Sequence, residues 1–149
     1  MATKKTGASA EAEIRQLVEK WTEALRAKDV DGLMANYAPD MVLFDLAPPL
    51  QYKGADAYRK NWEQWLPTIE GPIGCERREL SITAGEDVAY CHCLNRITAK
   101  RTDGTDTDVW VRVSVCYRKT RAKWLVTHEH VSVPFYMDGS LKAAVDLKP

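Results

Sequence analysis

The second half of the chain is a series of β-strand patterns separated by very short turns. Four strands are predicted, over residues 78–83, 88–100, 107–117 and 123–133. The links between them, such as Thr102–Gly104 and Lys119–Arg121, are only a few residues long. Links of that length join antiparallel neighbours, because parallel strands need a crossover of about a dozen residues or more. The region after Gly74 therefore predicts an antiparallel meander.

Helical patterns are confined to the first half of the chain. Apolar residues at helical spacing predict amphipathic helices over residues 14–26 and 55–66 and a short helix from Asp29 to about Tyr37. A strand over Met41–Phe44 lies between the second helix and the third. Helices segregated from a run of antiparallel strands indicate an α+β domain in which the helices cover one face of the sheet.

Length and charge narrow the classes of function. With 149 residues the chain has room for one domain, predicted over residues 13–134, between a disordered leader at residues 1–12 and a C-terminal tail at residues 135–149. Lys plus Arg and Asp plus Glu both total 21, so no net field attracts nucleic acid or an anionic membrane. No segment has the pattern of a signal peptide or a membrane span. Four cysteines are too few for a disulfide scaffold, which indicates reduced thiols in a cytoplasmic protein. The expected partner is a small-molecule ligand.

Polar side chains alternate with apolar ones along the last two predicted strands. One face of the earlier strand carries Trp110, Arg112, Ser114 and Cys116, and one face of the last strand carries His128, His130 and Ser132. We infer that these two rows lie on the same face of the sheet. The opposite face of the earlier strand carries valine at positions 109, 111, 113 and 115. We interpret the polar face as the floor of a binding cavity, and a polar surface exposed to solvent is the alternative.

Short motifs occur in a recognisable order along residues 13–134. They are Ala27–Val30, Tyr37–Asp40, Val42–Asp45, Gly54–Tyr58, Arg112, Trp124 and His128–Ser132. In this order they resemble the nuclear transport factor two-like superfamily, in its SnoaL-like or ketosteroid-isomerase-like branch. The resemblance implies a cone made of a curved antiparallel sheet wrapped by three N-terminal helices. The closing His-Glu-His-Val-Ser also resembles the association domain of calcium/calmodulin-dependent kinase, a non-catalytic, oligomerising relative. The resemblance thus implies a fold and not a single function.

Asp45 is the first candidate for a catalytic residue. It follows the first predicted strand, and this placement resembles that of the catalytic base in ketosteroid isomerases. In an apolar cone lined by Trp62, Trp65 and Trp110, burial would raise the pKa of this carboxyl toward the range useful for proton transfer. The alternative is that Asp45 accepts backbone hydrogen bonds at a strand end. The isomerases also use a tyrosine and a protonated aspartic acid. Trp21 stands near that tyrosine position, so steroid isomerisation by the same residues is not expected.

Arg112 and two histidines are the other leading candidates. Arg112 stands near the position of the isomerases' aspartic acid, and its permanent charge would favour a carboxylate or enolate ligand. The alternatives are an exposed arginine or one paired with Glu129 or Asp108. His128 and His130 could act as general acid and general base near neutral pH.

A wider set of aromatic and polar residues is expected to contact the ligand. It comprises Tyr37, Trp62, Trp65, His92, Trp110 and Ser114. No metal site is predicted, because His128 and His130 are not part of a four-ligand spacing pattern. No nucleotide or other cofactor motif is present in the sequence.

Two functions fit these patterns. The leading hypothesis is a cofactor-independent isomerase, cyclase or dehydratase acting on a carbonyl-containing, acidic or aromatic compound. Asp45 would abstract a proton next to the carbonyl, while Arg112 and a histidine would hold the resulting anion. The alternative is a non-catalytic ligand-binding or oligomerisation module, a homodimer that associates through the valine face of its sheet. Core packing beneath the helices explains the same valines, so the direction of that face decides between the two explanations.

Overall fold

The computed structural model describes residues 2–149, with side chains from Ala8 onward. Within this part of the chain, helices precede a long run of strands. The elements are α1 (Ala2–Arg26), α2 (Val30–Met34), β1 (Tyr37–Phe44), β2 (Tyr52–Lys53), α3 (Ala55–Trp65), a 3-10 helix η1 (Leu66–Thr68), β3 (Ile69–Ala84), β4 (Val88–Arg101), β5 (Asp106–Thr120) and β6 (Lys123–Ser132). The predicted α+β class is confirmed.

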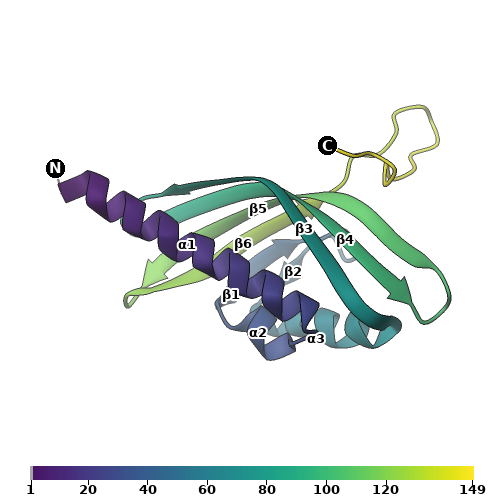
Figure 1. Cartoon of the computed structure of the whole chain (residues 1–149), viewed down its shortest axis with the longest axis horizontal. Helices are drawn as coiled ribbons and strands as arrows, with labels where there is room; N and C mark the ends of the chain where they lie inside the picture. The colour runs from purple at the N-terminus through teal and green to yellow at the C-terminus, as the bar shows by residue number, and fades with distance from the viewer. Residues whose placement is uncertain (1) are drawn as a thin grey trace.

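The strands form one curved sheet in the order β2-β1-β6-β5-β4-β3 (Figure 1). Strands β3 to β6 make the predicted antiparallel meander. Strand β1 lies beside β6 and runs parallel to it, with Val42 opposite His128 and Leu43 opposite Glu129. The helices between β1 and β3 make this parallel pairing possible, because they carry the chain away from β1 before the meander begins.

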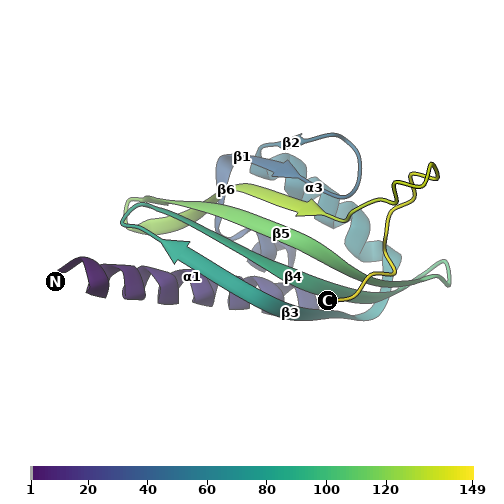
Figure 2. The ribbon, with the colours of Figure 1, turned by 90° about the horizontal axis from the view of Figure 1, so that it is seen from above.

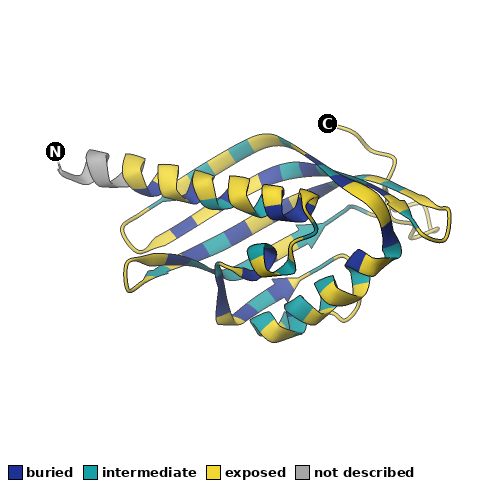
Figure 3. Ribbon diagram, turned by 60° about the horizontal axis from the view of Figure 1, so that its bottom comes forward, coloured by how far each residue is buried: buried dark blue, intermediate teal, exposed yellow. Residues whose placement is uncertain are grey.

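Helix α1 lies along one face of the sheet, which we call the inner face (Figure 1). Its buried residues line the side turned toward the strands, and its exposed residues cover the other side (Figure 3). Ala10, Ile14 and Val18 lie four residues apart on that side, and all three are buried. The leader at residues 1–12 was expected to be disordered, but α1 begins at Ala2. Alanine favours a helix, and Ala10 extends the apolar stripe of α1. Met1 lies outside the described residues.

Strand β3 begins at Ile69, well before its predicted start at residue 78. Gly71 and Pro72 favour a loop in the sequence. In the structure β3 is an edge strand, where proline costs no ladder hydrogen bond, and the pairing with β4 is irregular between Glu70 and Gly74. The strand predicted from the sequence pattern is therefore shorter than β3.

The valine face of β5 points inward. Val111, Val113 and Val115 are buried in the core that includes Ile14 and Val18 of α1. The idea that these valines form a dimer interface is therefore wrong, since the helices already cover them. The alternate residues of β5 lie on the opposite face, which we call the outer face.

The C-terminal tail folds back on itself beyond β6 (Figure 2). The backbone N–H of Ala144 donates to the carbonyl of Pro134 at 2.8 Å, and Phe135 forms an isolated bridge with Ala143. Ala144 is buried, while most of the tail is exposed. Among the described helices, none is both long enough and apolar enough to cross a bilayer.

Truncation of Leu43 should destabilise the fold. Leu43 is fully buried on β1, and Leu43→Ala is expected to lower the free energy of unfolding by about 2–5 kcal/mol, as cavity-forming core substitutions do. Urea unfolding followed by circular dichroism measures the change. Leu50→Ala is the matched control, because Leu50 is 95% exposed, and it should change stability by less than about 0.5 kcal/mol. Equal losses in the two variants would contradict this assignment of the core.

Candidate functional site

A cavity of about 300 Å³ opens between the inner face of the sheet and helices α1 and α3. We call it the wide cavity. Its wall is mainly apolar and aromatic, and includes Trp21, Tyr58, Trp62, Trp65, Ile97, Val109, Val111 and Val131. The aromatic rings pack edge to face or tilted, with centroids 6.1 Å apart for Trp21 and Trp62 and 5.7 Å apart for Trp62 and Trp65. A volume near 300 Å³ and an aromatic wall suit one small ring compound.

Asp45 lies in the wall of the wide cavity, directly after β1. The backbone N–H of Leu46 donates to Asp45 Oδ1 at 2.7 Å, and Asn61 Nδ2 donates to Asp45 Oδ2 at 3.4 Å. Burial raises the pKa of Asp45, and the hydrogen bond from Leu46 partly opposes that change. Asp45 therefore accepts a backbone hydrogen bond at the strand end and also lines the wide cavity.

A second carboxyl group, that of Glu129 on β6, also faces the wide cavity. Tyr37 Oη donates to Glu129 Oε1 at 3.0 Å, and Tyr58 Oη donates to Glu129 Oε2 at 3.4 Å. Burial raises the pKa of Glu129 to about 7, the hydrogen bonds from the tyrosines act in the opposite direction, and the nearby charge of Asp45 adds to the increase. Burial also raises the pKa of both tyrosines, so they remain neutral donors. The site thus holds two carboxyl groups whose pKa values are both shifted upward.

Sequence reasoning missed Glu129 as a site residue, although a signal was present. Glu129 has the same strand parity as Val131, in a strand whose neighbour β5 carries valines on its inner face. A charged residue in an apolar row is costly unless it is hydrogen-bonded. The position of Glu129 in this apolar row therefore indicates a buried, hydrogen-bonded carboxyl group.

Most of the polar residues predicted to line the cavity lie instead on the outer face. Six of the predicted residues do not line the wide cavity: His92, Trp110, Arg112, Ser114, His128 and His130. The expectation that they form the cavity floor is wrong, because strand alternation turns them away once the valines and Glu129 point inward. Tyr37, Trp62 and Trp65 do reach the inner side: the two tryptophans line the wide cavity and Tyr37 binds Glu129.

The outer-face residues have their own partners. Arg112 Nε donates to Ser132 Oγ at 3.1 Å. His128 Nδ1 lies 2.7 Å from the carbonyl oxygen of Val42, and the ring of Phe44 lies edge-on to His128, with centroids 4.8 Å apart. Across the sheet, His92 pairs with Ser114, and Ser114 pairs with His130. No group of three or more metal-ligating side chains is found in the described part of the chain.

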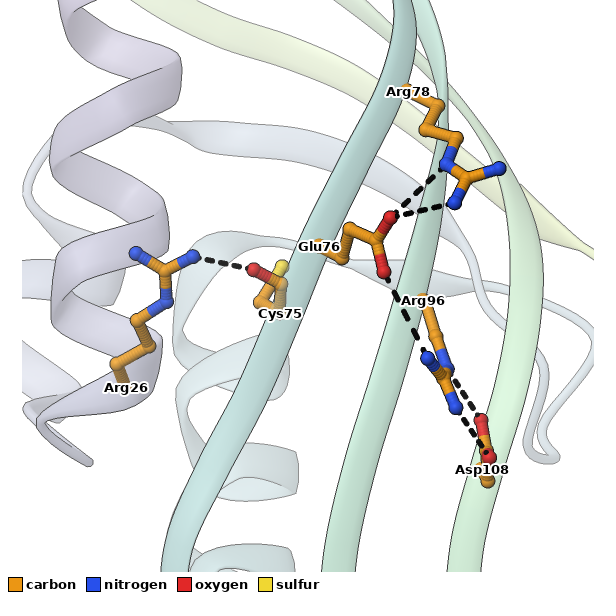
Figure 4. A network of polar contacts seen from close by, with 6 residues as sticks. All are labelled: Arg26, Cys75, Glu76, Arg78, Arg96 and Asp108. Atoms are coloured by element: carbon orange, nitrogen blue, oxygen red, sulfur yellow. Dashed lines mark hydrogen bonds and ion pairs between the residues drawn. The ribbon is translucent and has the colours of Figure 1, made fainter.

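An ion-pair network occupies the outer face of β3, β4 and β5 (Figure 4). Arg96 donates to both oxygens of Asp108 at 2.8 Å and lies 3.8 Å from Glu76. The hydrogen bonds from Arg96 lower the pKa of Asp108. Asp108, one of the expected partners of Arg112, thus pairs with Arg96 instead. Arg78 binds Glu76 and stacks over the ring of Trp110 at 5.0 Å. Trp110 is therefore a surface contact of this network and not part of the cavity wall.

Comparisons with known proteins agree with the fold. The family model for the SnoaL-like domain matches residues 14–136. An NTF2-like protein of unknown function from Pseudomonas putida KT2440 is 42% identical over 95% of this chain and 98% of that chain, with a TM-score of 0.87. These matches confirm the superfamily and the branch that the motifs predicted.

More distant solved structures share the fold alone. An NTF2-like superfamily protein from Salmonella enterica is 16% identical over 89% of this chain and 96% of its own, with a TM-score of 0.76. A ketosteroid isomerase-like protein from Erwinia carotovora atroseptica is 19% identical over 82% of this chain and 94% of its own, with a TM-score of 0.69. No match is found among curated proteins.

The raised pKa of Glu129 should make stability depend on pH. The folded state holds this proton more tightly than the unfolded state. The contribution of Glu129 to the free energy of unfolding is therefore full below pH 4.5 and is lost as pH rises through about 7. The loss is on the order of 3 kcal/mol over that range. Urea unfolding at several pH values between 4.5 and 8 measures it.

Glu129→Gln should flatten the pH dependence in this range, because glutamine keeps the shape and does not titrate. Glu86→Gln, at an exposed turn position, should leave it unchanged. A pH profile of Glu129→Gln identical to that of the wild type would show that Glu129 does not titrate with a raised pKa.

Proposed function

Since the chain belongs to the SnoaL-like domain family, we propose that it is an enzyme that binds a small, mainly aromatic carbonyl compound in the wide cavity and moves a proton at the carbon next to the carbonyl. The observation that carries this proposal is the pair of carboxyl groups, Asp45 and Glu129, with raised pKa values in one mainly apolar cavity. Isomerases and dehydratases share this step, and in the proposed mechanism side-chain carboxyl groups carry it out.

Asp45 is the proposed general base. Its carboxyl group lies at the edge of the apolar wall, where burial increases its basicity relative to an ordinary aspartate. Leu46 and Asn61 hold the two oxygens in place through hydrogen bonds, so the carboxylate does not need to reorganise when a ligand binds. The proton taken from the ligand carbon would stay on Asp45 until it returns to another atom of the ligand.

Neutral donors are the proposed partners of the carbonyl oxygen, which becomes negatively charged when the proton leaves. A Glu129 with a pKa near 7 is partly protonated at neutral pH and can then donate a hydrogen bond. The indole N–H of Trp62 is buried, lines the same cavity and has no partner among the described residues. Donors already in place in an apolar site stabilise a developing oxyanion strongly.

Asp45→Asn should reduce proton transfer by at least about a hundredfold while the fold stays intact, because a general base contributes about 10²–10⁴-fold. Proton NMR in D₂O measures exchange at the carbon next to the carbonyl of 1-indanone, 2-tetralone and phenylpyruvate, which needs no knowledge of the product. Asp40→Asn is the control, since Asp40 is exposed on the same strand. Unchanged exchange in Asp45→Asn would remove Asp45 from the chemistry.

We also propose that two copies associate through the outer face. Val88, Tyr90 and Phe44 are 53%, 49% and 38% exposed there, beside the row formed by His92, Ser114 and His130. Exposed apolar and aromatic side chains rimmed by polar ones are typical of protein interfaces. The proposed interface between copies is thus on the outer face and not on the valine face. Association through the outer face is compatible with a ligand in the wide cavity.

Light scattering after size exclusion should give the mass of a dimer at micromolar concentration. Tyr90→Glu should shift the protein toward the monomer, because it places a charge within the apolar patch. Gln64→Glu adds the same charge on the exposed side of α3 and should leave the dimer unchanged. A wild-type protein that stays monomeric throughout this range would contradict the interface.

A further inference from the structure

A second, smaller cavity of about 60 Å³ lies between α1 and the inner face of the sheet. We call it the inner chamber. Trp21 and Glu129 line both the inner chamber and the wide cavity, so the two spaces are neighbours. The chamber has room for a few water molecules or for one carboxylate group.

Two buried N–H donors of the inner chamber lack partners. Among the described residues, the buried side-chain nitrogens without a hydrogen bond are Trp21 Nε1, Trp62 Nε1 and Arg77 Nε. Trp21 and Arg77 both line the inner chamber. Buried donors are nearly always hydrogen-bonded in native proteins, so two of them in one cavity indicate a bound acceptor.

Arg77 also carries a charge that no carboxylate compensates. Its Nη2 donates to Thr22 Oγ1 at 2.6 Å, and no acidic side chain of the described residues lies within ion-pair distance. Cys91 and Cys93 line the same chamber, but burial raises the pKa of both thiols, to about 11 for Cys91, so they are neutral. A guanidinium that no carboxylate neutralises attracts an anionic group, and its planar donors suit a carboxylate, which favours an anion over water alone.

We propose that the inner chamber binds the carboxylate group of a ligand whose aromatic part occupies the wide cavity. Arg77 Nε and Trp21 Nε1 donate to the carboxylate oxygens. The planar arrangement of donors on a guanidinium matches a carboxylate well. The substrate class is therefore an aromatic carboxylic acid. This inference rests on the proposed binding of a small molecule in the wide cavity, and it does not depend on the proton transfer.

Binding of matched acids and amides tests the proposal. The probes are benzoate, phenylacetate and 3-phenylpropanoate with their primary amides, and the measurement is the dissociation constant from isothermal titration calorimetry. The full-length wild-type protein should bind at least one acid about tenfold or more tighter than its amide. Arg77→Met should reduce this preference to less than about twofold, because it removes the charge and keeps a side chain of similar length.

Two further variants keep the test decisive. Arg78→Met removes an exposed arginine on the outer face and should keep the full preference. Trp21→Phe removes one donor but keeps an aromatic ring, and it should weaken acid binding more than amide binding even if Arg77→Met fails to fold. Equal affinity of the wild type for acids and amides, no binding of any acid, or a preference that survives Arg77→Met and Trp21→Phe would each overturn the proposal.

The outcome is separable from that of the proposed function. Acid binding that depends on Arg77, without any exchange of carbon-bound protons, would contradict the proton transfer and support the inner chamber. Exchange of protons on 1-indanone without any acid preference would do the opposite.

Discussion

The packing of α1 against the inner face of the sheet is the constraint on which the rest of the structure depends. Ile14 and Val18 of the helix belong to the same buried core as the valines of β5, and the burial of this apolar surface decides which face of every strand points inward. Because side chains alternate along a strand, the same contact turns Glu129 toward the cavity and His128 toward the outside. The chemistry available to the cavity is therefore a consequence of apolar packing.

The wide cavity combines an apolar wall with a few polar groups whose pKa values are shifted by burial. Glu129 is buried, yet two tyrosine hydroxyls satisfy it, so it can remain in the core while its pKa lies near neutrality. Asp45 also lines the cavity, and the backbone N–H of Leu46 donates a hydrogen bond to it. The inner chamber, which Glu129 also lines, adds a cation, Arg77. Asp45 and Glu129 in the wide cavity and Arg77 in the inner chamber place polar groups of different charge around two neighbouring spaces.

The sequence predicted the helices and strands better than it predicted which strands pair with one another. The helices, the meander and the position of Asp45 after β1 followed from local periodicity and from the family motifs. The parallel pairing of β1 with β6 and the early start of β3 did not, because both depend on which distant strand supplies hydrogen bonds. An acidic ligand was expected from Arg112, which lies on the outer face; Arg77 lies beside the cavity instead. A bulge between Arg78 and Ser81 shifts the alternation of β3, so its inward residues could not be read from simple parity.

By itself, the sequence determined the fold class and the two alternating faces of β5 and β6, because apolar periodicity reports local geometry. It did not determine which face the helices would cover, since valines in a row suit a core and an interface equally well. The tertiary structure decided this, because α1 can cover only one face of the sheet and burial of the valines is the more favourable choice. With that choice made, Glu129, Tyr37, Tyr58 and Arg77 come together from four separate elements, a proximity that no local pattern contains.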